Sequence, residues 1–221
     1  MSYSSLLSGL VLTITALSAN LAASAEFVLQ DSQGQPLADA VILIDDAPAA
    51  SRPPAVMDQI SMRFAPNVLV VSPGTLVEFP NSDDVRHHVY SFSPAKRFEL
   101  RLFQGAEAPP VQFEEEGAVV LGCNIHDQMI GYVLVTSAGA FGVSDADGRV
   151  LLPSVEPGNW TVRWWHPSLG EQAPQALGAM ELSGAPVQLA LPVARDSAAQ
   201  SAPALSPLQQ RFRRAAHDAA H

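Results

Sequence analysis

The sequence predicts an all-β protein built from β-sandwiches. Two observations favour this class: the apolar runs are short, and clusters of Gly, Pro, Asn and Asp separate them at regular intervals. A third is that apolar residues spaced as on one face of a helix are nearly absent. Many short strands with turn signals between them are typical of two packed antiparallel sheets.

The predicted strands fall into two sets, separated by a short linker. We expect the first set at residues 26–29, 40–44, 61–64, 68–71, 76–79, 88–92, 118–121 and 131–136. We expect the second at 141–144, 149–152, 160–165 and 187–191. Residues 45–54, rich in Ala and Pro, and residues 137–140 have the composition of linkers. The strand-rich block between the linkers has the size of a domain.

The first 25 residues predict a secretory signal peptide. They carry no charged side chain, contain the apolar run of residues 10–17, and end in Ala23-Ser24-Ala25. The alternative is an uncleaved membrane anchor, but the run is shorter than the roughly 20 residues that a spanning helix needs. We therefore expect cleavage after Ala25, a periplasmic protein, and no integral membrane span after cleavage.

Charge and length limit the classes of partner. Among 221 residues, 22 are acidic and 12 basic, which gives a formal net charge of −10. This balance excludes nucleic acid as a ready partner. It fits either a solvated surface or one that attracts a basic protein partner. Residues 194–221, rich in Ala, Ser, Pro and Gln, are predicted to be a disordered tail.

The lone cysteine lies in a motif of metal-binding side chains. The sequence has no second cysteine with which it could form an intramolecular disulfide, and an exposed thiol is a liability in an oxidising compartment. Cys123, His126 and Met129 follow one another at intervals of three residues, between two apolar runs. A thiolate, imidazoles and a weak axial thioether are the donors of a mononuclear electron-transfer copper site. A second imidazole is expected from the pair His87-His88, and only one of the two enters the site, because neighbouring strand residues face opposite ways.

The motifs at residues 57–136 resemble the cupredoxins, the small blue copper proteins. The sequence Arg86-His87-His88-Val89 matches their first ligand segment, and Cys-x-x-His with a following Met matches their second, with the short gap of amicyanin and pseudoazurin. The resemblance implies a Greek-key β-sandwich that binds one type 1 copper through His87, Cys123, His126 and Met129, with His126 as the surface port for electrons. His88 replaces the Asn that usually braces the ligand loop, so that bracing hydrogen bond is in doubt.

The segments on either side of this block resemble two parts of a transthyretin-like or carboxypeptidase-regulatory-like β-sandwich. The predicted organisation is a signal peptide (1–25), a first part of the accessory sandwich (26–50), a cupredoxin domain (56–136), the remainder of the accessory sandwich (140–193) and the tail (194–221). The cupredoxin domain is then an insertion in the accessory sandwich. The alternative is an independent accessory domain that follows the cupredoxin.

These features predict a periplasmic one-electron carrier that meets redox partner proteins. The alternative is a copper carrier or buffer without a dedicated redox partner, because the same donors suit both. An enzyme is not expected: the sequence has no His-x-His pair for a multicopper cluster, and one cysteine cannot build a thiolate-bridged dinuclear centre.

Overall fold

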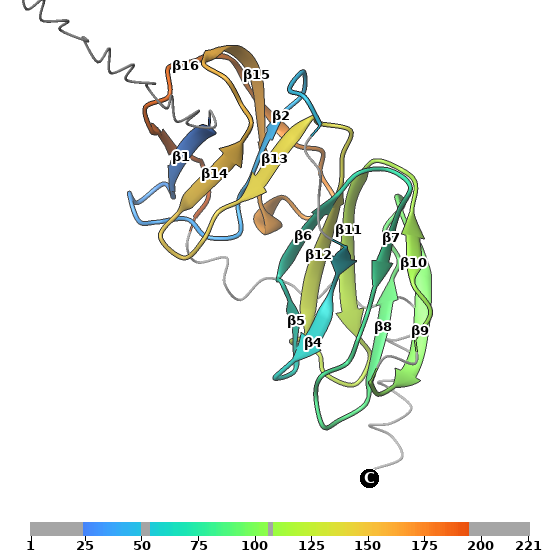
Figure 1. Cartoon of the computed structure of the whole chain (residues 1–221). Helices are drawn as coiled ribbons and strands as arrows, with labels where there is room; N and C mark the ends of the chain where they lie inside the picture. The colour runs from blue at the N-terminus through green and yellow to red at the C-terminus, as the bar shows by residue number, and fades with distance from the viewer. Residues whose placement is uncertain (1–23, 50–53, 106–107, 195–221) are drawn as a thin grey trace, which may run out of the picture.

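The computed structural model describes residues 24–49, 54–105 and 108–194, and these residues form an all-β protein (Figure 1). The predicted signal peptide, except for Ser24 and Ala25, and all of the predicted tail except Ala194 lie outside them. Among the described residues, no helix is long and apolar enough to cross a membrane. The strands are β1 (Ser24–Gln30), β2 (Val41–Ile44), β3 (Ala55–Val56), β4 (Asp58–Ile60), β5 (Arg63–Ala65), β6 (Val68–Val71), β7 (Thr75–Glu78), β8 (His87–Ser91), β9 (Phe98–Phe103), β10 (Val111–Phe113), β11 (Gly117–Cys123), β12 (Ile130–Val135), β13 (Ala140–Val143), β14 (Arg149–Pro153), β15 (Gly158–Trp165), β16 (Gln175–Leu182) and β17 (Val187–Ala190), and one 3₁₀ turn spans Pro167–Leu169.

The strands from β3 to β12 form one sandwich, which we call the metal sandwich. Its five-stranded sheet has the order β6-β12-β11-β8-β9, and its second sheet has the order β10-β7-β3. The short hairpin β4-β5 lies at one end. Side chains of both sheets meet in one buried core that includes Phe79, Phe113, Val119 and Val133. Alternating burial along β8 shows the period of two that fixes which side chains enter this core.

The strands before and after the metal sandwich pair with one another, and we call their assembly the second sandwich. Strand β1 pairs antiparallel with β14 and parallel with β17, while β2 lies between β13 and β15. The two resulting sheets have the orders β14-β1-β17 and β13-β2-β15-β16. They enclose a core of their own around Phe27, Ile42 and Trp164.

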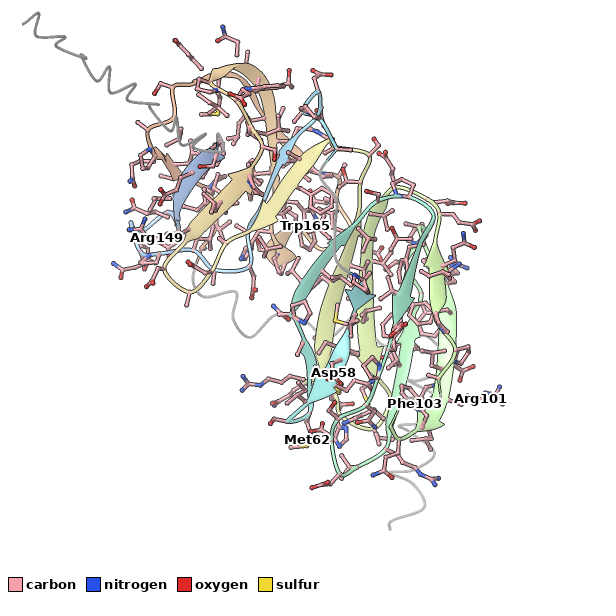
Figure 2. All side chains as sticks on the ribbon, viewed as in Figure 1. Asp58, Met62, Arg101, Phe103, Arg149 and Trp165 are labelled. Atoms are coloured by element: carbon pink, nitrogen blue, oxygen red, sulfur yellow. The ribbon has the colours of Figure 1, made fainter. Side chains whose placement is uncertain are left out.

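A third buried cluster joins the two sandwiches. It combines Val41 and Trp165 of the second sandwich with Val68, Tyr132 and Leu134 of the metal sandwich. The Tyr132 and Trp165 rings lie 5.6 Å apart in an edge-on arrangement. Figure 2 shows Trp165 at this junction, whereas Asp58 and Met62 lie at the opposite end of the metal sandwich.

The two chain connections between the sandwiches lie side by side. The amide of Gly139, just before β13, donates a hydrogen bond to the carbonyl oxygen of Asp45, just after β2, at 3.2 Å. An added Cβ at Gly139 would lie 1.6 Å from the carbonyl oxygen of Ala47. Residue 139 must therefore be glycine, because the backbone of the other connection, at Ala47, lies too close for a side chain.

The observed strands differ from the predicted ones in two ways. The predicted strand at 61–64 is wrong at its start: Ser61 and Met62 form the turn of the β4-β5 hairpin, with φ values of 54° and 57°. Five strands were not expected from the sequence: β3, β4, β9, β10 and β16. Each lies at the edge of its sheet, and β3, β4 and β10 are only two or three residues long, so their apolar alternation is weak.

Candidate metal centre

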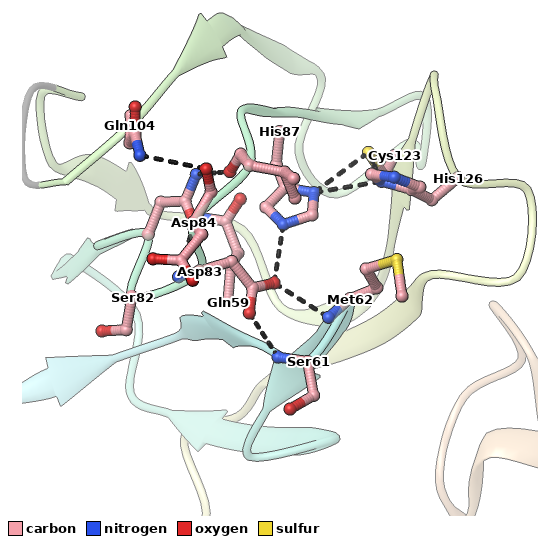
Figure 3. Close-up of polar contacts among 12 residues, drawn as sticks. Gln59, Ser61, Met62, Ser82, Asp83, Asp84, His87, Gln104, Cys123 and His126 are labelled. Carbon is pink, nitrogen blue, oxygen red and sulfur yellow. Dashed lines mark hydrogen bonds and ion pairs between the residues drawn. The ribbon is translucent and has the colours of Figure 1, made fainter.

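Three side chains converge at the end of the metal sandwich that lies away from the second sandwich. The Nδ1 atoms of His87 and His126 are 3.2 Å apart, and the Cys123 Sγ lies 3.8 Å from the first and 3.6 Å from the second. His87, Cys123 and His126 form a cluster that could hold a metal ion. Figure 3 shows the His87 ring directed toward the other two side chains.

The local strand geometry brings Cys123 and the loop that follows it to this position. Cys123 is the last residue of β11 and pairs with Val89 of β8, two residues beyond His87. Residues 124–129 connect β11 to β12, and the Met129 amide donates to the His126 carbonyl oxygen at 2.9 Å, which closes a tight turn. Met129 is buried and belongs to the same core cluster as Cys123. Its side chain therefore lies beneath the loop rather than in solvent.

His87 and His88 lie on opposite faces of β8. His87 is completely buried beside Cys123, whereas the His88 Nε2 lies 2.9 Å from an Oε1 of Glu99 on β9. The structure thus brings His87, and not His88, to the cluster. His88 does not brace the site, because its partner is the exposed edge strand.

The ring of His87 is held by a carboxylate. Its Nε2 lies 2.8 Å from Oδ2 of Asp83, four residues earlier in the loop before β8. The same carboxylate accepts hydrogen bonds from the Ser61 and Met62 amides in the β4-β5 turn, at 2.5 and 2.8 Å. Burial raises the pKa of Asp83, but the hydrogen bonds from Met62, His87 and Ser61 outweigh it and hold the pKa below its usual range. Asp83 is therefore ionised at neutral pH.

Asn81 fixes the loop that presents Asp83. Its side-chain amide donates to the carbonyl oxygens of Val85 and Phe103, and its Oδ1 accepts from the Asp83 amide. Asn81 is buried, and its backbone exchanges two hydrogen bonds with Gly105. These hydrogen bonds fix the conformation of the loop at 81–86.

The three donors fit a single metal ion. The point equidistant from the three atoms lies about 2.1 Å from each, as follows from their mutual distances. Zn²⁺, for example, binds imidazole nitrogen at about 2.0–2.1 Å and thiolate sulfur at about 2.3 Å. Two imidazoles and one thiolate in a trigonal set are the donors that suit copper in an electron-transfer site.

Exposed apolar side chains surround this end of the sandwich. Ile60 and Met62 in the β4-β5 hairpin, Val85 in the loop before β8, and Ile125 in the β11-β12 loop are each about half exposed. His126 is partly exposed among them, whereas His87 and Cys123 are buried. His126 is therefore the member of the cluster that reaches the surface.

Comparison with solved structures finds similarity to cupredoxins. A purple cupredoxin from Nitrosopumilus maritimus is 24% identical, with a TM-score of 0.34, and the match covers 37% of this chain and 99% of that one. Two variants of amicyanin are 23% and 24% identical, with TM-scores of 0.35 and 0.34, and cover 44% of this chain and 99% of theirs. No protein-family model and no curated protein matches the chain.

Asp83, which contacts His87 in the structure, was not singled out from the sequence. Residues 81–84 have the composition of a turn, and nothing in the sequence alone showed that one carboxylate of that turn points back at His87. The sequence does place an acidic residue four positions before a candidate ligand. The short loop between the two residues could have indicated that they lie close together.

Proposed function

We propose that the chain binds one copper ion through His87 Nδ1, Cys123 Sγ, His126 Nδ1 and the Met129 thioether, and that it carries single electrons. The observation that supports this most directly is the convergence of two imidazole nitrogens and a thiolate around one point at metal-ligand distance. Copper supplies the one-electron chemistry when bound. The chain holds the donors in place on β8, on β11 and in the loop that joins β11 to β12.

The arrangement favours electron exchange over copper delivery. His87 and Cys123 are buried, and the loop around His87 is fixed by Asn81 and Asp83. Donors held in this way move little when the charge of the ion changes, and they oppose release of the ion to another protein. The partly exposed His126 and its apolar surroundings provide a route for electrons to a docked redox partner. We propose a carrier and not an enzyme.

We propose further that the metal sandwich is a cupredoxin domain inserted into the second sandwich. Pairing of β1 and β2 with strands that follow residue 139 supports this organisation. The predicted leader supports export to the periplasm, where Cys123 has no second cysteine in this sequence with which to form an intramolecular disulfide.

The test is titration of the purified protein with Cu(II), monitored by visible absorption. We expect an intense thiolate-to-copper band at one equivalent of copper, and its loss in Cys123→Ala and His87→Asn. His88→Asn is the matched control, because it changes the neighbouring imidazole on the other face of β8, and it should keep the band. Met129→Leu should keep the band but shift the reduction potential. A band that persists in Cys123→Ala would refute the site.

Electron carriage is tested by cycling the loaded protein between oxidised and reduced forms in the presence of a Cu(I) chelator. A carrier retains its copper through repeated cycles. Loss of copper to the chelator in the reduced form would favour the buffer function instead.

A further inference from the structure

We propose that Asp83 is a positioning residue that selects the metal-binding tautomer of His87 and lowers the reduction potential of the site. This inference rests on the proposed copper function. The geometry that carries it is the 2.8 Å contact between Asp83 Oδ2 and the fully buried His87 Nε2.

The first step is the tautomer. A neutral imidazole carries one N–H, and an ionised carboxylate only accepts, so the His87 proton must sit on Nε2 to satisfy Asp83. Nδ1 is then left with its lone pair, and it is the Nδ1 atom that lies 3.8 Å from Cys123 Sγ and 3.2 Å from His126 Nδ1. The carboxylate thereby prepares the ligand atom before a metal arrives.

The second step is the rigidity of the carboxylate. Asp83 accepts from His87 and from two successive backbone amides, those of Ser61 and Met62. Both of these residues have positive φ, a conformation that is uncommon for side-chain-bearing residues and is typical of the tightest hairpin turns. The β4-β5 turn and the His87 ring are therefore fixed by the same two oxygens. Figure 3 shows Asp83 between them.

The third step is the charge. An ionised carboxylate bound to the far nitrogen makes an imidazole a stronger donor, and such partners of metal-bound histidines typically change metal affinity by about 10–100-fold when removed. A negative charge favours the more highly charged Cu(II) over Cu(I). Asp83 thus stabilises the oxidised site more than the reduced one, which lowers the reduction potential.

The chain offers a matched control on the next residue. The His88 Nε2 lies 2.9 Å from Oε1 of Glu99 without the geometry of a hydrogen bond, on the face of β8 that points away from the cluster. Glu99→Gln removes a carboxylate charge, from a more exposed position than that of Asp83, without contacting the site. Ser82→Ala, in the same loop as Asp83, removes the hydrogen bond from the Ser82 hydroxyl to Asp58 of β4. It leaves the contact between Asp83 and His87 in place, so it reports loosening of the loop alone.

The experiment compares Asp83→Asn with these two variants by affinity for Cu(II), Cu(I) and Zn(II) and by reduction potential. We expect Asp83→Asn to weaken Cu(II) and Zn(II) binding about 10–100-fold and Cu(I) binding less. The potential should rise by about 59 mV for each tenfold change in the ratio of the two copper affinities. Asp83→Glu, which keeps the charge, should recover part of the shift. Unchanged potential and affinities in Asp83→Asn, equal to those of Glu99→Gln, would overturn the proposal.

A measurement on the natural protein keeps the proposal testable if Asp83→Asn does not fold. Nitrogen-15 NMR of the metal-free protein at pH 8 should show His87 protonated on Nε2, and protonation on Nδ1 would contradict the assignment. Failure of the proposed function is distinct: the natural protein would then show no thiolate band with copper, whatever the tautomer of His87.

Discussion

Replacement of Trp165 by alanine tests whether the two sandwiches stabilise one another. Trp165 is completely buried at their junction, with its ring 5.6 Å from that of Tyr132. Loss of a buried Trp side chain usually costs about 3–5 kcal/mol, of which an aromatic pair contributes about 0.5–1.5 kcal/mol. The indole N–H has no acceptor among the described residues, and removal of such a donor recovers about 1–3 kcal/mol. The difference between these two effects is about 2 kcal/mol, and we expect Trp165→Ala to lower the free energy of unfolding by this amount.

The assay is thermal and urea unfolding, followed by circular dichroism, with the copper band as a separate probe. For a chain of this length, each kcal/mol lowers Tm by about 2–4 °C, so the expected shift is on the order of 4–8 °C. The copper band should be unchanged in the folded variant. Trp165 lies at the junction, whereas Met62, whose amide donates to the carboxylate beside His87, lies at the opposite end of the metal sandwich. Trp165→Phe is the control: it keeps the ring against Tyr132 and removes the unpaired N–H, so its loss should be much smaller.

Two results would refute this reasoning. A loss of less than about 1 kcal/mol in Trp165→Ala would mean that the junction contributes little to stability. A Phe variant as unstable as the Ala variant would mean that the indole N–H, and not the ring, is the stabilising group.

Three further predictions concern the connections, the loop before β8 and the response to pH. Gly139→Ala should strongly destabilise the fold or abolish it, since its Cβ would lie 1.6 Å from a backbone oxygen, and soluble yield with circular dichroism would show this. Asn81→Ala leaves the carbonyl oxygens of Val85 and Phe103 without their side-chain donor, and the second of these hydrogen bonds is buried. Urea unfolding should therefore show a loss of about 1–3 kcal/mol, and the affinity for copper should fall. Burial lowers the pKa of His166 despite the opposing effects of the nearby Asp39 charge and the Ala38 backbone. Unfolding at acidic pH therefore takes up a proton at His166, so the free energy of unfolding should fall as the pH drops below about 6.5. Urea unfolding at a series of pH values should show a smaller decrease of this free energy in His166→Gln.

Short sequence patterns predicted much of the fold, and they singled out the three side chains that the structure brings together, His87, Cys123 and His126. The spacing of Cys123 and His126 was informative because one loop carries both, so their proximity needs no tertiary knowledge. Strand alternation correctly indicated that only one member of the pair His87-His88 faces Cys123. The all-β class followed from the short apolar runs, which are a local property of the chain.

The features that sequence could not supply depend on contacts between distant segments. The role of Asp83 requires the loop before β8 to meet a turn more than twenty residues earlier, at Ser61 and Met62. That turn itself was predicted as strand, because Met62 continues an apolar pattern although its backbone is left-handed. Edge strand β16 was missed for a related reason: it is stabilised by pairing with β15 and not by burial of its own side chains.

The paired connections between the sandwiches have a mechanical consequence. The chain leaves the second sandwich beside Asp45 and returns to it at Gly139, where one hydrogen bond joins the two crossings. A force applied to the two ends of the chain therefore acts first on the second sandwich, including the parallel pair β1 and β17. Only afterwards does tension reach the metal sandwich. The metal centre stays unloaded until the second sandwich has opened.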